Sequence, residues 1–321
     1  MMRGPTAGVR GPRRNGALPR LERAQQLAEV VAKVNAREPI NDAERRLLSA
    51  GGSFGGAKPK ALIDITGEQW VIKFFNNEPV DVPLIEHASM TLARQAGIAT
   101  AQTRLVPLVG ENALAVRRFD RVAGRRVHCI SAGTALRASV VEGLEPDFGY
   151  PQLAQLLRRT GDTSDGSNQR EMGELFRRMV FNILIDNTDD HEKNHALLIA
   201  DPWSFGRLRL APAYDVLPTN SGQGQQEFVV GLDGRDSTLS NAMSQCELFA
   251  LRRDEAAAEV LEVIAVVGRW KAHFRACGVA TADIDDLAQR IDGDGLRLQR
   301  QEFGAATSAA APRKRHRNPF I

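Results

Sequence analysis

The chain has 321 residues, which is enough for one large domain or two smaller ones with a sizeable core. Its hydrophobic content of 43% and charged content of 25% are ordinary for a soluble globular protein, and no apolar run reaches the roughly 20 residues that span a bilayer. The formal net charge of +3 comes from arginine-rich ends, since residues 24–303 carry about −6. We therefore expect neither a membrane protein nor a nucleic-acid-binding surface on the folded body.

The three cysteines, Cys129, Cys246 and Cys277, are scattered along the chain and odd in number. This pattern predicts neither a disulfide framework nor a zinc site, and it suits the reducing cytoplasm. No signal-peptide hydrophobic region follows the arginine-rich start. We predict a cytoplasmic protein in which residues 1–20 and 304–321 are disordered basic tails.

Residues 21–120 are predicted to form a small lobe of mixed helix and strand. Apolar residues recur with helical spacing over 21–35, and Asn41 followed by Glu44 resembles a capping box that opens a second helix ending near Leu48. A glycine-rich stretch occupies residues 51–60. The elements expected after it are strands at 61–66 and 69–75 around a turn at Gly67, a helix from Pro83 to Gln95 stopped by Gly97, and strands near 103–108 and 113–119.

Residues 121–303 are predicted to form a mostly helical lobe. The expected elements are helices at 150–159, 171–186, 254–268 and 282–291, and a strand pair at 196–200 and 207–211. The fold class is therefore predicted to be α+β, with a small antiparallel-sheet N-lobe ahead of a helical C-lobe. This is the two-lobed order of a protein kinase.

Asp189 and Asn194 lie five residues apart in the run Asn-Thr-Asp-Asp-His-Glu-Lys-Asn. A protein-kinase catalytic loop has this spacing, with an aspartate that accepts the substrate hydroxyl proton and an asparagine that holds magnesium. Asp215 follows in Pro-Ala-Tyr-Asp, where a carboxylate would bridge magnesium to the phosphates. Ordinary turn chemistry at a helix end uses the same residue types, so the order of all these positions is what favours a kinase site.

Lys73 ends the apolar strand segment Trp-Val-Ile-Lys, the place from which a kinase lysine grips the α- and β-phosphates. A buried lysine needs a partner, and Glu86 on the following helix is the candidate. The alternative is a lysine on an edge strand that extends its ammonium group to water.

The glycine-rich stretch is the candidate phosphate loop, because glycines let backbone N–H groups approach a phosphate closely. Gly55 and Gly56 offer such donors, and Lys58 and Lys60 add charge. A flexible loop between a helix and a strand would have the same composition. A Walker A loop is excluded, since the residues after Gly56 are Ala-Lys-Pro and a strand follows.

The segment from His191 to His195 also matches HExxH, the pattern of zinc proteases. A working HExxH lies inside a helix with apolar neighbours and has a third ligand downstream. Here the preceding and central residues are polar, and the apolar run at 196–200 is typical of a strand. A zinc hydrolase is therefore a remote alternative.

Four motifs, at residues 51–60, 116–121, 187–195 and 212–217, resemble those of HipA-like serine/threonine kinases, the toxins of bacterial type II toxin–antitoxin modules. The resemblance implies a two-lobed kinase-like fold and phosphorylation of a protein serine or threonine that depends on ATP and Mg²⁺. It makes Asp189 the catalytic aspartate, with Asn194 and Asp215 as magnesium ligands.

The same resemblance implies the rest of the ATP site. The residues that it assigns to ATP are Gly55, Gly56, Ala57, Lys58, Lys60 and Lys73 for the phosphates, the hinge Arg117, Arg118 and Phe119 for adenine, and His191 and Tyr214 nearby. Ser53 matches a serine that family members autophosphorylate. A phosphate on Ser53 would place about two negative charges beside the phosphate site and disfavour ATP there.

The family also suggests partners. Its known targets include aminoacyl-tRNA synthetases, chiefly glutamyl-tRNA synthetase, and its members bind a small helix-turn-helix antitoxin, so any DNA contact would be indirect. The chain resembles a short form that lacks most of the N-terminal subdomain of longer members, for which a separate protein would substitute. The alternative function is an inactive, truncated kinase-like protein that acts by binding an antitoxin or DNA partner.

Overall fold

The computed structural model describes residues 17–51, 59–75, 78–140, 147–199, 206–219, 222 and 224–310. The chain divides into two compact units, one of residues 1–79 with 104–118 and one of residues 80–103 with 119–321. The helix at 82–95 therefore groups with the second unit, whereas the sequence-based division places it in the N-lobe. The predicted lobe boundary near residue 120 stays a prediction.

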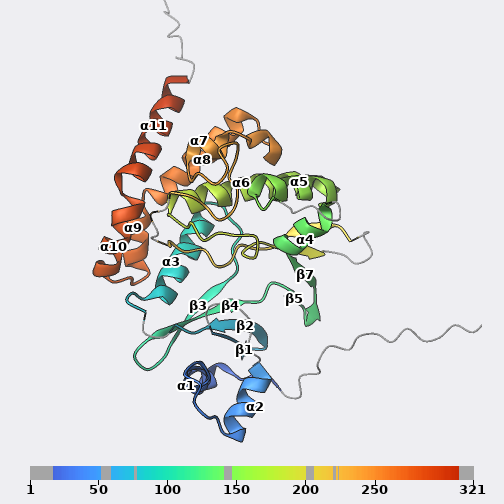
Figure 1. Ribbon diagram of the computed structural model, residues 1–321, viewed down its shortest axis with the longest axis vertical. Helices are drawn as coiled ribbons and strands as arrows, with labels where there is room; N and C mark the ends of the chain where they lie inside the picture. The colour runs from blue at the N-terminus through green and yellow to red at the C-terminus, as the bar shows by residue number, and fades with distance from the viewer. Residues whose placement is uncertain are drawn as a thin grey trace, which may run out of the picture. The chain divides into compact units, whose positions relative to one another are not determined.

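The first unit is a four-stranded sheet with two helices, drawn in blue and green in Figure 1. Its elements are η1 (Leu21–Arg23), α1 (Ala24–Asn35), α2 (Asp42–Gly51), β1 (Lys60–Ile65), β2 (Glu68–Lys73), β3 (Thr103–Pro107) and β4 (Asn112–Arg117). The strand order is β1-β2-β4-β3, and β2 pairs antiparallel with both β1 and β4. Local signals build the unit as predicted, since Asn41 and Glu44 form the capping box of α2.

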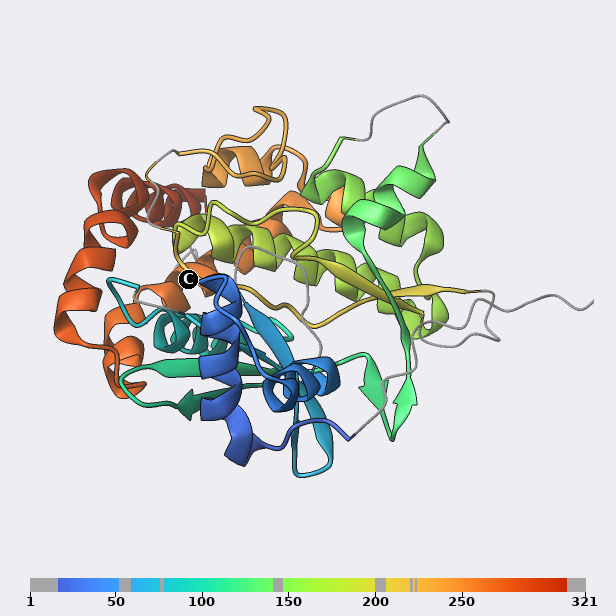
Figure 2. The same cartoon turned by 60° about the horizontal axis from the view of Figure 1, so that its bottom comes forward.

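One face of this sheet packs against the two helices (Figure 2). Ile63 on β1 and Ile72 on β2 form a buried cluster with Leu27 and Val30 of α1. Because side chains alternate along a strand, Lys73 belongs to the opposite face of β2 from Ile72. Lys73 is 7% exposed, so the sequence-based alternative of a lysine reaching water from an edge strand is wrong.

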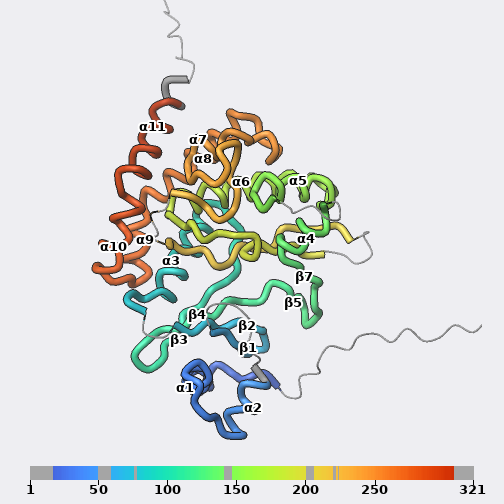
Figure 3. Tube along the Cα trace, viewed as in Figure 1, coloured from blue at the N-terminus to red at the C-terminus, as the bar shows by residue number. Residues whose placement is uncertain are grey.

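The second unit is mostly helical, and Figure 3 traces it from α3 to α11. Its helices are α3 (Val82–Gln95), α4 (Ala132–Ser139), α5 (Tyr150–Thr160), η2 (Ser164–Gly166), α6 (Ser167–Leu184), α7 (Leu239–Met243), η3 (Cys246–Phe249), α8 (Arg253–Val267), α9 (Trp270–Ala276), α10 (Thr281–Ile291) and α11 (Asp294–Ala310). Its strands are the pair β5 (Arg121–Val122) and β6 (Arg125–Arg126), and the sheet of β7 (His128–Ser131), β8 (Ala196–Ile199) and β9 (Leu208–Leu210). No helix within the described ranges has the length and apolar character needed to cross a membrane.

Helix α6 is the core of this unit, with most of its side chains buried. Among its buried polar residues, Glu171, Arg178 and Asn182 share one face, because positions separated by 7 and 11 residues align on a helix. The segment after α6 leads directly into the run 187–195 and then into β8. The buried helix α6 therefore anchors the segment that carries Asp189 and leads directly into it.

The structure corrects both predicted tails where it describes them. The backbone of residues 19 and 20 pairs with Asp64 of β1, so the end of the segment 1–20 joins the sheet. Helix α11 continues to Ala310, past the predicted boundary at 303, because the run Gly-Ala-Ala-Thr-Ser-Ala-Ala contains four alanines, the strongest helix formers. Residues 1–16 and 311–321 lie outside the described residues.

Candidate functional site

The run 187–195 forms a compact turn that is closed by its own side chains. The side-chain amide Nδ2 of Asn194 donates to the backbone carbonyl of Asp189 over 3.2 Å. The backbone N–H of Asn194 donates to the carbonyl of His191 over 2.9 Å, and that of Lys193 donates to His191 Nδ1 over 3.2 Å. The five-residue spacing is thus the span of a closed loop, with Asp189 at one end and Asn194 at the other.

The two adjacent aspartates of this loop occupy opposite environments. Asp189 is exposed, whereas Asp190 is 2% exposed and accepts hydrogen bonds from Tyr150, Asn182 and His195. Burial alone would raise the pKa of Asp190, but His195 and the hydrogen bonds outweigh it and hold that pKa below its usual value. Asp189 is therefore the carboxylate able to meet a substrate, and Asp190 is tied into the protein.

The segment with Asp215 lies beside this loop. Tyr214 donates its hydroxyl hydrogen bond to the carbonyl of Lys193 over 2.7 Å, and Arg178 of α6 donates to the carbonyl of Ala211 over 2.8 Å. Asp215 itself has a φ of 60°, in the left-handed region that a residue with a side chain adopts rarely. Such strained backbone gathers at functional sites when surrounding contacts enforce it.

A second link joins the two segments at their far ends. The Thr219 hydroxyl accepts from the backbone N–H of Thr188 over 3.0 Å and lies 2.6 Å from the Thr188 hydroxyl. It also donates to the carbonyl of Asp186, which receives the Thr219 N–H as well. The Asp189 loop and the Asp215 segment are thus fastened to each other on both sides.

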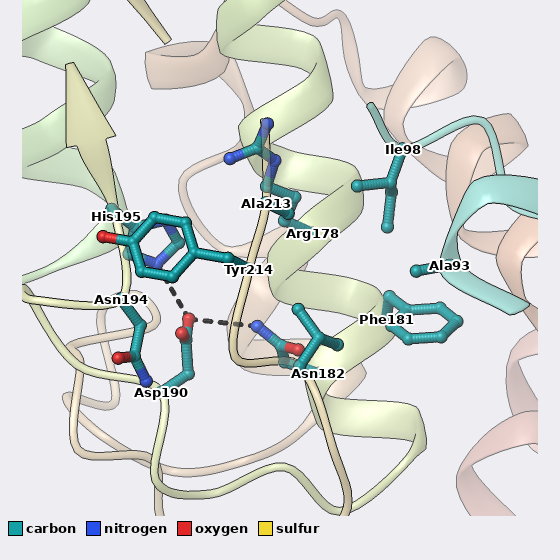
Figure 4. A pocket seen from close by; sticks show the side chains of 11 residues that line it. Ala93, Ile98, Arg178, Phe181, Asn182, Asp190, Asn194, His195, Ala213 and Tyr214 are labelled. Carbon is teal, nitrogen blue, oxygen red and sulfur yellow. Dashed lines mark hydrogen bonds and ion pairs between the residues drawn. The ribbon is translucent and has the colours of Figure 1, made fainter. Parts of the chain in front are cut away.

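Behind these segments lies a small cavity of about 10 Å³. Asn194, His195, Asp190 and Tyr214 line it together with the α6 residues Arg178, Phe181 and Asn182, as Figure 4 shows. It has room for about one water molecule and none for a nucleotide. The cavity therefore belongs to the support of the site and is not itself a substrate pocket.

Two predicted ATP-site residues contact each other in the second unit. The rings of Phe119 and Tyr214 stack with centroids 5.6 Å apart and an angle of 29° between their planes. The neighbouring hinge residues belong to the first unit, where Arg117 forms an ion pair with Glu68 and the backbone N–H of Arg118 donates to the Gln69 carbonyl over 3.0 Å. This sheet bond occupies one backbone donor of the predicted hinge.

The remaining predicted residues are reported within their own units. Lys60 begins β1 and is half-buried, and Lys73 ends β2 and is buried. Glu86, on α3 of the second unit, is 1% exposed, which is unusual for a glutamate. The residues predicted to hold or regulate phosphates that lie outside the described residues are Ser53, Gly55, Gly56, Ala57 and Lys58.

The zinc-protease alternative depends on a helix through His191 and His195, and the structure has none there. His191 lies in the turn, with its Nδ1 engaged by Lys193, and His195 is buried at the start of β8 beside Asp190. Across the described ranges, no three His, Cys, Asp or Glu side chains gather in a metal-binding cluster. The zinc-protease geometry predicted by HExxH is therefore wrong for this segment.

Comparisons with known proteins show the family and the fold of the chain. The model of the HipA-like C-terminal domain family matches residues 52–270, more than half of the chain. Y4dM of Sinorhizobium fredii, named provisionally as a kinase, is 31% identical over 209 residues, which cover 60% of this chain and 45% of that protein. A Haemophilus influenzae protein with a similarly provisional kinase name is 24% identical over 188 residues, or 51% of this chain and 52% of that protein. The chain thus spans about half the length of the curated relatives it matches.

Two solved structures share the fold. HipA of Shewanella oneidensis MR-1, solved with HipB and operator DNA, has 15% sequence identity and a TM-score of 0.60, covering 87% of this chain and 71% of that one. The Helicobacter pylori proinflammatory kinase CtkA has 13% identity and a TM-score of 0.55, covering 79% and 91%. These similarities confirm the predicted fold class, an α+β fold of the kinase type. On its sequence match and its fold, the chain belongs to the HipA-like C-terminal domain family.

Proposed function

We propose that the chain is a serine/threonine protein kinase that uses ATP and Mg²⁺. The observation that carries this proposal is the closed loop in which Asn194 bonds to the Asp189 carbonyl while the Asp189 carboxylate stays exposed. A phosphoryl-transfer site needs a free carboxylate at a fixed distance from a metal ligand, because it acts by positioning and charge neutralisation.

In the proposed reaction Asp189 orients the hydroxyl of the acceptor residue and takes its proton. The hydroxyl oxygen forms a bond to the γ-phosphorus while the bond from that phosphorus to the β–γ bridging oxygen breaks. Within the described part of the chain, no hydrogen bond holds the Asp189 carboxylate, so it is available for the proton. Asp190 is unsuited to this role because three donors already occupy its carboxylate.

Asn194 and Asp215 would hold the magnesium ion, which would neutralise charge on the phosphates. Their donor atoms fit this ion, because magnesium prefers hard oxygen ligands. The Nδ2 of Asn194 is directed to the Asp189 carbonyl, so the Oδ1 of the same amide is the atom left for a cation. The bond from Tyr214 to Lys193 keeps the residue next to Asp215 against this loop.

The nucleotide contacts remain part of the proposal. We assign phosphate binding to Lys60, Lys73 and the glycine-rich loop, and adenine binding to the segment that ends at Phe119. We further propose that Ser53 is an autophosphorylation site whose modification disfavours ATP.

The proposed acceptor is a cytoplasmic protein, with glutamyl-tRNA synthetase as the first candidate. The proposed partner is a small helix-turn-helix antitoxin through which DNA would be reached indirectly, since the HipA neighbour was solved with HipB and operator DNA. A separate N-subdomain-like protein is a second proposed partner.

The test is transfer of labelled γ-phosphate from ATP in the presence of Mg²⁺, with the purified chain and glutamyl-tRNA synthetase as acceptors. Label should appear on serine or threonine. The rate of labelling should fall by about 10²-fold to 10⁴-fold in the Asp189→Asn variant. Asp285→Asn is the matched control, because Asp285 is also an exposed aspartate and lies on α10. Unlabelled acceptors with the wild-type chain would reject the proposal, and growth inhibition that survives Asp189→Asn would favour a binding function.

A further inference from the structure

The carboxylate of Asp190 is the meeting point of three structural elements. Its Oδ2 atom accepts hydrogen bonds from the Tyr150 hydroxyl of α5, from Asn182 Nδ2 of α6 over 3.0 Å, and from His195 Nε2 over 2.8 Å. Figure 4 shows two of these bonds, with Asn182 and His195 on either side of Asp190. A buried carboxylate is costly unless it is hydrogen-bonded, so these three bonds stabilise Asp190 in its buried position.

Aromatic packing encloses the same carboxylate. His195 stacks on Phe228 with ring centroids 5.4 Å apart, and Tyr150 packs edge-on against Phe228 at 4.9 Å. All three rings are almost fully buried. Burial and the Asp190 charge raise the pKa of Tyr150 well above its usual value, so its hydroxyl keeps its proton and donates.

The same surroundings determine which ring nitrogen of His195 carries a hydrogen. Its Nε2 faces the acceptor Asp190, so Nε2 carries the hydrogen, and its Nδ1 is buried with no hydrogen-bond partner among the described residues. Such an arrangement holds one geometry of the segment 190–195 and penalises others.

The position of Asp190 gives this geometry a consequence for the catalytic loop. Asp190 follows Asp189 directly, and its partner His195 follows Asn194 directly. Fixing Asp190 against His195 therefore fixes both ends of the turn that the Asn194–Asp189 bond closes. The exposed Asp189 and the buried Asn194, the two proposed functional residues, therefore each lie next to a residue whose side chain is fixed by this bond.

We propose that Asp190 is a positioning residue: its buried carboxylate, held by Tyr150, Asn182 and His195, sets the separation of Asp189 and Asn194. This rests on the proposed kinase function for its effect on turnover, although the effect on the loop itself does not. Asp190 touches no substrate in this account and acts through the backbone of the loop.

The main test compares Asp190→Asn, which keeps the shape and removes the charge, with Tyr150→Phe, which removes one donor and keeps the ring. Asp190→Asn should lower kcat by about 100-fold, because a misplacement of about 1 Å costs that much. Tyr150→Phe should lower kcat by about tenfold, or roughly half of that effect on a logarithmic scale. Both variants should raise the half-saturating Mg²⁺ concentration and leave the KM for ATP within about threefold.

The matched control is Val263→Ala on α8, which lowers thermal stability through a buried position that makes none of these bonds. At a temperature well below every melting point, this variant should retain the wild-type kcat and Mg²⁺ dependence. An equal loss of kcat in Val263→Ala, or a kcat within about threefold of wild type in Asp190→Asn, would overturn the proposal.

Amide hydrogen exchange over residues 188–195 gives a readout that needs no activity. Exchange should quicken there in Asp190→Asn and Tyr150→Phe, and remain at the wild-type rate in Val263→Ala. Unchanged exchange in Asp190→Asn would refute the positioning role. If the wild-type chain transfers no phosphate, the kinase proposal fails alone, and the exchange rates still decide this one.

Discussion

Arg178 and Arg177 are consecutive arginines on α6, and they make a matched pair for testing how the site is supported. The side chain of Arg178 is 4% exposed, and it donates to Glu174 and to the carbonyl of Ala211 at the start of the Asp215 segment. The side chain of Arg177 is 20% exposed and pairs with Glu259. Comparing substitutions at these two positions measures the effect of side-chain burial on stability, since both residues are arginines on the same helix.

Arg178→Met should lower the free energy of unfolding by about 3–5 kcal/mol, because it leaves the buried Ala211 carbonyl unpaired and breaks the ion pair between a buried arginine and the partly exposed Glu174. Arg177→Met should cost only about 0–1 kcal/mol, since water can replace its partners. At about 2–4 °C per kcal/mol, the melting temperature should fall by roughly 6 to 20 °C for Arg178→Met and by at most about 4 °C for Arg177→Met.

The assay is urea unfolding followed by circular dichroism, together with phosphoryl transfer at a temperature where both variants are folded. Arg178→Met should also reduce turnover by at least about tenfold, because Ala211 leads into Asp215. Equal losses of stability in the two variants would refute the reasoning that burial decides the cost. A stability loss confined to Arg178→Met with unchanged turnover would show that this anchor does not position Asp215.

Three further outcomes follow from the same contacts. Tyr214→Phe loses the hydrogen bond of the hydroxyl and keeps the ring stack, so the free energy of unfolding measured by urea titration should fall by about 0.5–1.5 kcal/mol. Thr219→Val removes the hydroxyl that accepts from the N–H of Thr188, and it should lower the free energy of unfolding by about 1–3 kcal/mol by the same assay while lowering kcat more than it changes KM for ATP. The pKa of Asp190 is lowered in the folded state, so its stabilisation is complete above about pH 4 and is lost as pH falls through the folded value. Acid titration of the unfolding free energy should therefore be steeper below about pH 4 for wild type than for Asp190→Asn.

Local sequence signals predicted part of the regular elements. The capping residues Asn41 and Glu44, and the stop at Gly97 with its φ of 74°, act within a few residues and are readable without the fold. The short strand β7 was not predicted, because four residues form a strand there only through pairing with β8, over 60 residues away. Helix α4 follows β7 directly and was missed with it.

Part of the candidate site could be predicted from the sequence, because some of its contacts lie within a single loop. Asp189 and Asn194 are joined by a bond within one loop, so their spacing alone carries the geometry. The contacts on which the proposed role of Asp190 rests are not readable from the sequence, because Tyr150 lies 40 residues earlier in the chain and only the fold brings the two together. A weak signal was present in α6, whose buried side carries the polar residues Glu171, Arg178 and Asn182 among apolar ones.

The most direct test of the central claim is a crystal structure of the chain with a non-hydrolysable ATP analogue and Mn²⁺ in place of Mg²⁺. Anomalous scattering locates the metal without assumptions about its ligands. We predict a manganese peak roughly 2.0–2.3 Å from Asn194 Oδ1 and from a carboxylate oxygen of Asp215, with the γ-phosphate facing Asp189. A metal bound by His191 or His195, or a nucleotide bound away from Asp189, would contradict the account.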